Sequence, residues 1–198
     1  MALTKAEQRI VGEIEDILRI GGYDWRIVEE LYEPAARAPQ LQRIKLDFIR
    51  MNVIGDYVFA DELLTAVIVA YFFPVRKFPK RWKDKRIRTF VHFVMERLFM
   101  LQKLALVKQI RKFDRAMART LERLDALRNA MAHSFTPEMR REYRETKRVT
   151  WEGRDIYTTE GIEQFDADMR KLTDYLVEMA FGKAVARLAR ELREGEGA

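Results

Sequence analysis

The sequence predicts an all-α protein: an up-and-down helical bundle with one small β-hairpin before the last helix. Three observations support this fold class. Apolar residues recur at helical spacing along most of the 198 residues, Gly and Pro fall between these periodic runs, and one short stretch alternates as a hairpin does. There is no internal repeat and no linker, so we expect a single domain over residues 1–198.

Two helices are expected before the first prolines. The first begins at Thr4, because the run "TKAE" places a Glu three residues after a Thr, which is a capping-box pattern. It ends before Gly21, where the periodic run stops. A shorter helix is expected over residues 25–32, and Pro34 and Pro39 then interrupt the chain.

The second of the long helices is expected from Leu41 to Phe73, with Gly55 as an irregularity and Pro74 as its stop. It contains the most apolar run of the chain, "LLTAVIVAYFF", residues 63–73. A run of 11 residues is too short to cross a bilayer, which needs about 20. We therefore interpret it as a buried helix segment.

The remaining elements follow from changes of periodicity. Helical spacing predicts a third helix over residues 89–108, a fourth over 112–133 and a last one over 160–192. The stretch "RVTWEGRDIYTT", residues 148–159, alternates around Glu152-Gly153 and predicts a hairpin. The tail, residues 194–198, is expected to fray.

The composition fits a soluble intracellular protein. The chain is 48% hydrophobic and 34% charged, so it can bury a core and still have a charged surface. It has no Cys, which excludes a disulfide scaffold and thiolate metal sites. The first 20 residues contain no uninterrupted apolar segment, so we expect no signal peptide, no membrane association and a cytoplasmic location.

The positive charge is concentrated in residues 76–88, "RKFPKRWKDKRIR", which we name the basic segment. It holds eight Lys or Arg and one Asp, so its net charge is +7, whereas the whole chain carries +6. Such a segment, interleaved with aromatic rings, suits RNA: phosphates meet the charges and a base can stack on an indole. A solvated inter-helix loop is the alternative. The predicted RNA-binding residues are Arg76, Lys77, Lys80, Arg81, Trp82, Lys83, Lys85, Arg86 and Arg88.

An arginine falls in the apolar stripe of the fourth predicted helix. The stripe comprises Phe113, Met117, Leu121, Leu124, Met131 and Phe135, and its one long step is divided by position 128. We therefore expect Arg128 to lie where a core residue belongs. A guanidinium there needs a carboxylate partner or an opening onto a cleft or a second chain, because an unpaired buried charge is costly. Asp56, Asp61 and Glu62 are candidate partners, with a solvated acidic strip as the alternative.

Two further polar residues flank Arg128 near the expected helix end. Asn129 lies four residues before His133 and on the same helical face, whereas Arg128 lies about 140° round the helix from His133. Ala130 and Ala132 would let a substrate or a second backbone approach. From the pattern alone, a salt-bridged Arg with a capping His is the alternative to a functional site.

The segment "RNAMAH", residues 128–133, resembles the signature of the HEPN superfamily, the helical domains of prokaryotic toxins, anti-phage systems and CRISPR-associated nucleases. That signature is an Arg, four to six residues and a His near the end of a long helix, often with an Asn directly after the Arg. The wider resemblance is a helical bundle with this motif late in the chain. Some HEPN toxins carry a modifiable Tyr two residues after the His, where this chain has Phe135.

The resemblance implies a metal-independent endoribonuclease that acts as a homodimer, in a toxin or defence role. Arg128, Asn129 and His133 would be the catalytic residues, contributed by both chains across a two-fold axis. RNA, a second copy and an antitoxin or regulatory protein are the implied partners, with no cofactor. Some HEPN domains only bind nucleotides or assemble, so a non-catalytic module is the alternative. A helical DNA-binding protein is a third hypothesis, although no helix-turn-helix pattern is visible.

Other chemically suggestive residues have simpler interpretations. His92 lies among apolar residues and is expected to be a core or rim residue. Trp151 and Tyr157 are expected to pack locally around the hairpin. The chain has no HExxH motif, glycine-rich phosphate loop or Cys/His cluster, so the sequence predicts no metal site.

Overall fold

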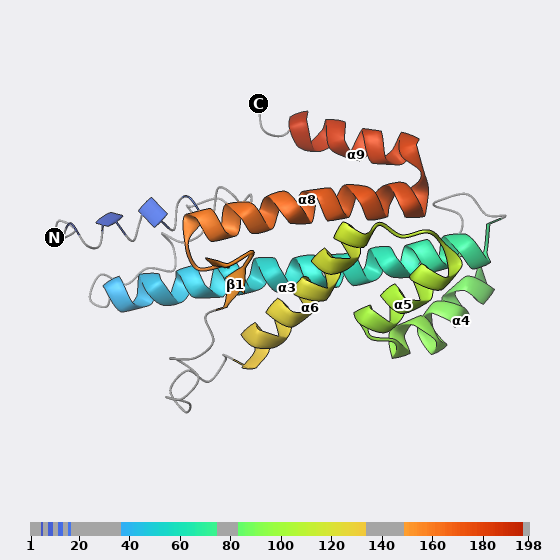
Figure 1. Cartoon of the computed structure of the whole chain (residues 1–198), viewed down its shortest axis with the longest axis horizontal. Coiled ribbons are helices and arrows are strands. Elements are labelled where there is room, and N and C mark those ends of the chain that lie inside the picture. Colours follow the sequence, from blue (N-terminus) through green and yellow to red (C-terminus); the bar gives the residue numbers. More distant parts are fainter. Residues whose placement is uncertain are drawn as a thin grey trace. The chain divides into compact units, whose positions relative to one another are not determined.

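The computed structural model describes residues 37–74, 83–133 and 149–195, together with six helical positions nearer the N-terminus: Lys5, Gln8, Arg9, Gly12, Glu13 and Asp16. The protein is mostly helical, with one two-stranded hairpin before the last long helix (Figure 1). The predicted fold class is confirmed. The capping box at Thr4, the helix over residues 25–32 and its following Pro34 lie outside the described residues.

The chain groups into two compact units, each built from two separate stretches. One comprises Met1–Gly55 and Ala126–Asp168, and the other comprises Asp56–Asp125 and Met169–Ala198. Three long helices, α3, α6 and α8, each contribute residues to both units. The expectation of a single domain stays a prediction.

Helix α3 spans Arg37–Phe72 and begins four residues earlier than predicted. Pro39 is therefore its third residue, within the first turn, where a missing N–H removes no intrahelical bond. The helix continues through Gly55 without the expected irregularity. It stops before Pro74 as predicted, and the amide of Phe73 makes the last bond, to the Val69 carbonyl at 2.9 Å.

The predicted third helix is divided in two, which corrects the prediction. Helix α4 spans Lys85–Phe93, a 3₁₀ turn spans Met95–Arg97, and α5 spans Met100–Ile110. Met95 and Met100 are both fully buried, yet residues five apart point about 140° apart on a straight helix. The break lets both reach the core. Phe99 is extended, and its N–H donates to Gln102 Oε1 at 2.9 Å, which starts α5.

Helix α6 spans Arg115–His133, beginning three residues later than predicted. Asp114 sets this start, because its Oδ1 accepts hydrogen bonds from the backbone N–H groups of Ala116 and Met117 at 2.7 and 3.1 Å. Phe113 precedes the helix and packs edge-to-face on Tyr175, with ring centres 5.1 Å apart.

The hairpin is confirmed. Strand β1, Thr150–Trp151, pairs antiparallel with β2, Arg154–Asp155. The two turn residues, Glu152 and Gly153, both have positive φ, at 50° and 79°. A turn with positive φ at both central residues matches the twist of a two-residue hairpin loop.

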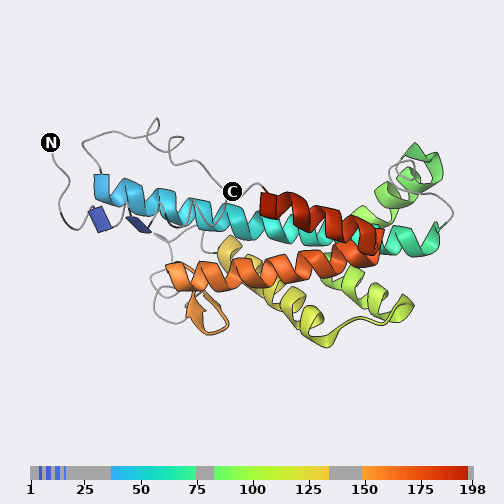
Figure 2. The same cartoon turned by 90° about the horizontal axis from the view of Figure 1, so that it is seen from above.

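The last predicted helix is also divided. Helix α8 spans Thr159–Phe181 and α9 spans Lys183–Gly195, so the tail expected to fray from residue 194 is helical to Gly195. Gly182 separates them with a φ of 87°, which a residue with a side chain rarely adopts. The chain reverses direction here in both views (Figures 1 and 2).

The hairpin lies so close to the start of α8 that position 161 must be glycine. A Cβ on Gly161 would overlap the backbone carbonyl of Asp155, whereas a Cβ on Gly55 would meet nothing within 4 Å. We expect Gly161→Ala to lower the free energy of unfolding by about 1–3 kcal/mol through overpacking. Gly55→Ala should raise it by about 0.4–1 kcal/mol by restricting the unfolded chain.

Urea unfolding followed by circular dichroism measures both variants. Equal midpoints for the two variants would contradict the close approach at Gly161.

Candidate functional site

Arg128 does not occupy the buried stripe of α6, and this corrects the prediction. Leu121, Leu124, Leu127 and Met131 are all buried, with steps of three, three and four residues. Leu127 therefore fills the place assigned to Arg128, which is exposed. The error arose because an α-helix has 3.6 residues per turn, so a gap of seven residues can be divided at either of two neighbouring positions.

The motif residues lie together on the last turns of α6. The Arg128 guanidinium Nη1 donates to the side-chain oxygen of Asn129 at 2.8 Å, and Asn129 is half-buried. His133 is the last residue of the helix, and its side chain lies outside the described part of the structure. The helix thus presents an exposed guanidinium, oriented by an amide, five residues before the backbone of His133.

The second half of the basic segment is helical, whereas the whole segment was expected to connect helices. Asp84 is the N-cap of α4, since its Oδ1 accepts from the Arg86 backbone N–H at 2.9 Å. The cations Lys83, Lys85, Arg86 and Arg88 are all exposed, and Ile87 is buried among them. Arg76, Lys77, Lys80, Arg81 and Trp82 lie outside the described residues.

Aromatic contacts hold α4 to the end of α3. The ring of Phe90 lies 5.4 Å from that of Phe73 and 6.0 Å from that of Phe72. Several large aromatic side chains between the end of α3 and the start of α5 are exposed, which the sequence did not indicate: Tyr71, Phe72, Phe93 and Phe99. The sequence gave no signal of this exposure, because Tyr71 and Phe72 belong to the apolar run, residues 63–73, that predicts a buried segment. Exposed rings close to cations in the sequence are typical of surfaces on which bases stack.

Of the three acidic candidates on α3, Asp61 has a structural partner. Its Oδ2 accepts from Lys103 Nζ at 2.6 Å, and the Lys103 side chain is only 4% exposed. A buried ammonium needs such an anion, so Asp61 fixes α5 against α3. For Asp56 and Glu62, a role in orienting Arg128 stays a prediction.

Three remaining interpretations can be compared with the structure. His92 is exposed and not a core residue, and its Nδ1 lies 2.8 Å from Glu96 Oε2. Trp151 packs locally as predicted: it is buried, contacts Phe165 edge-to-face, and donates from Nε1 to Asp168 Oδ2 at 3.1 Å. Tyr157 is half-buried.

Neither a metal centre nor a membrane span is visible in the described part of the chain. Its His, Asp and Glu side chains form no group of three or more that could hold a metal ion. None of its helices is long and apolar enough to cross a membrane.

Comparison of this chain with protein-family models, with curated proteins and with solved structures gives no match. The function must therefore be inferred from the residues themselves.

The neighbouring positions 127 and 128 give a direct test of the register of α6. Because Leu127 is 4% exposed, we expect Leu127→Ala to lower the free energy of unfolding by about 2–5 kcal/mol through cavity formation. Arg128→Ala should change it by no more than about 0.5 kcal/mol, because exposed side chains contribute little. Chemical denaturation measures both; a larger loss for Arg128→Ala than for Leu127→Ala would contradict the assigned register.

Proposed function

We propose that this protein is a metal-independent endoribonuclease of the HEPN type that acts as a homodimer in the cytoplasm, in a toxin or anti-phage role. The observation that carries the proposal is the contact between the exposed Arg128 and Asn129 near the end of α6, four to five residues before His133. The four exposed cations of the basic segment at the start of α4 support RNA as the substrate.

The chemistry requires three functions that these residue types can supply. The 2′-hydroxyl of the RNA attacks the adjacent phosphorus while a neutral imidazole removes its proton. The guanidinium of Arg128 binds the phosphate oxygens and stabilises the charge of the phosphorane. The 5′-oxygen leaves with a proton from an acid. The products are a 2′,3′-cyclic phosphate and a 5′-hydroxyl.

One histidine in the motif of each chain is too few for separate base and acid groups. An isologous dimer brings two copies of the same surface together, so His133 of each chain could serve one of the two roles. The proposal of a homodimer rests on this count of histidines. The apolar stripe of α6 gives no support for a dimer, since Leu127 and not Arg128 lies in the stripe.

A second candidate function is a non-catalytic HEPN-like module that binds RNA, a nucleotide or a protein. The exposed aromatic side chains near α4 favour binding as such, because they suit stacking and need no reaction. Analysis of RNA after incubation distinguishes the two candidates, since only the enzyme changes the length of its substrate.

We expect the protein to cleave single-stranded RNA in the presence of EDTA and to leave 2′,3′-cyclic phosphate ends. His133→Ala and Arg128→Ala should each lower the rate by about 100-fold or more, the usual contribution of a general acid–base group. Arg123→Ala, on the same helix outside the motif, is the matched control and should retain activity. Activity that is lost in EDTA and restored by Mg²⁺ would contradict the metal-independent mechanism.

Mixed dimers test whether the two chains share one site. Heterodimers of wild-type and His133→Ala chains should be nearly as inactive as the variant homodimer, because base and acid come from different chains. The measurement is the cleavage rate of purified, differently tagged heterodimers. Half of the wild-type rate would indicate independent sites, and a monomer in sedimentation at working concentration would remove the dimer from the proposal.

A further inference from the structure

A second group of cations gathers where α5 meets α6. A pocket of about 440 Å³ lies there, and five of its eight lining residues are Lys or Arg. Its net charge from lining residues is +4, because it contains one acidic side chain. Binding pockets for small organic ligands have similar volumes, roughly 300–1,000 Å³, but are lined mostly by apolar groups. The lining residues are Lys108, Arg111, Lys112, Phe113, Arg115, Ala118, Arg119 and Glu122.

Two of these cations hold the walls of the pocket. Lys108 Nζ lies 3.1 Å from Glu122 Oε1, which links α5 to α6. Arg111 Nη1 donates to the carbonyl oxygen of Met179 on α8 at 2.9 Å. The connection between α5 and α6 is fixed to α8 again next to Arg111, because the Asp114 N–H donates to the hydroxyl of Tyr175 at 2.8 Å. The pocket therefore has a fixed frame before any ligand binds.

The other three cations are exposed, and among the described residues they have no hydrogen-bonding or ion-pair partner. They are Lys112, Arg115 and Arg119. Their positions disfavour the folded state: Arg115 and Arg119 are like charges about one turn apart, and Arg115 lies in the first turn of α6, where the helix dipole repels cations. A bound anion would relieve both repulsions.

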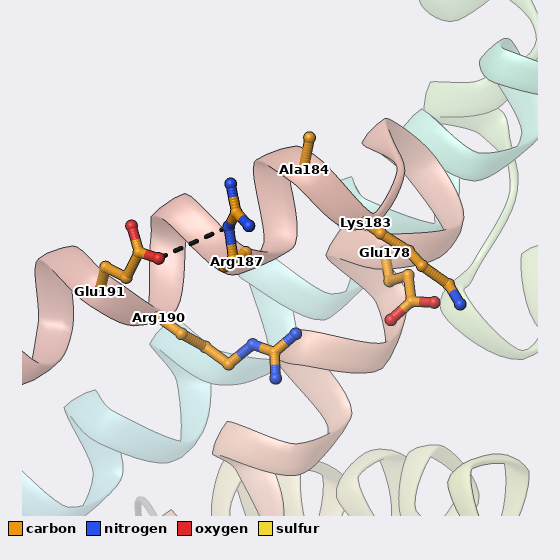
Figure 3. Close-up of a pocket in the computed structure, with 6 residues that line it drawn as sticks. All are labelled: Glu178, Lys183, Ala184, Arg187, Arg190 and Glu191. Atoms are coloured by element: carbon orange, nitrogen blue, oxygen red, sulfur yellow. Dashed lines mark ion pairs between the residues drawn. The ribbon is translucent and has the colours of Figure 1, made fainter.

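A pocket between α8 and α9 provides a contrast within the same unit. It is larger, about 720 Å³, and Figure 3 shows acidic side chains among its cations. Arg187 Nε lies 3.5 Å from Glu191, and Arg190 Nε lies 4.0 Å from Asp174 and donates to the Ala186 carbonyl. Because two of its three cations, Arg187 and Arg190, already lie close to carboxylates, this pocket offers an anion less than the pocket at α5–α6.

We propose that the α5–α6 pocket binds the phosphodiester backbone of single-stranded RNA through Lys112, Arg115 and Arg119. Arg115 and Arg119 are separated by a rise of about 6 Å along the helix. Two guanidinium groups at that spacing can each bind phosphate oxygens of one strand. The identity of the polyanion as RNA rests on the proposed function, whereas the anion site rests on the charges alone. The pocket would hold the RNA at a place distinct from the basic segment.

The test compares two variants with the same change of charge. One replaces Lys112, Arg115 and Arg119 by Gln; the control replaces Lys183, Arg187 and Arg190 by Gln. Both are made in the full chain with His133→Ala, so that a fluorescein-labelled oligouridine stays intact. Binding is followed by fluorescence anisotropy at several salt concentrations, after circular dichroism has established that both variants fold.

The α5–α6 variant should bind RNA at least about tenfold more weakly. The slope of log K against log salt concentration is negative, and it should become shallower by about 2, since each phosphate contact on a single strand contributes about 0.7. The control should keep the slope of the parent. Equal losses in both variants, or none in the first, would overturn the proposal. So would lost binding to phosphatidylserine vesicles with unchanged RNA binding, which would assign the pocket to a lipid surface.

Cleavage is measured separately on the chain that retains His133. Weaker RNA binding by the α5–α6 variant, with no cleavage by the wild type, would retain this inference and reject the proposed function. Cleavage by the wild type with unchanged binding by the variant would do the reverse.

Discussion

The ion pair between Asp61 and Lys103 is the interaction on which one of the two compact units depends most. Lys103 is almost entirely buried in α5, and an ammonium ion there would be strongly destabilising without an anion beside it. Asp61 on α3 supplies that anion at 2.6 Å. Its second oxygen, Oδ1, is buried and makes no hydrogen bond within the described residues. The pair thus favours this arrangement of α5 on α3, because separating the two groups would leave the Lys103 charge buried without a partner.

The position of α5 in turn decides where the α5–α6 pocket forms. Helix α5 ends at Ile110, and Arg111 binds the backbone of α8 immediately after it. The short connection that follows must then start α6 at Asp114, whose carboxylate caps the helix. Lys112, Arg115 and Arg119 are consequently held on a fixed frame. Cations on a fixed frame lose less conformational entropy on binding an anion than cations on a free chain.

The charges of this protein are used in two different ways. In the pocket between α8 and α9, Arg187 and Arg190 are matched by acidic side chains along and beside α9. At the start of α4 and at the α5–α6 junction, exposed cations gather with few acidic neighbours. In the first arrangement the opposite charges largely cancel, and because the ion pairs are exposed they contribute little to stability. The second leaves positive charge at the surface, which suits the RNA binding proposed above.

The sequence by itself determined the features that depend on a few adjacent residues. Pro74 ended α3, because proline has no N–H, and Gly153 marked the hairpin turn, because glycine adopts positive φ freely. The density of the basic segment and the presence of the Arg128–His133 motif are likewise properties of the chain. Only the tertiary structure decided which side of α6 is buried, where the third predicted helix breaks, and that Asp61 pairs with Lys103. These features depend on contacts between residues far apart in the sequence, and a local sequence pattern does not indicate which distant side chains will meet.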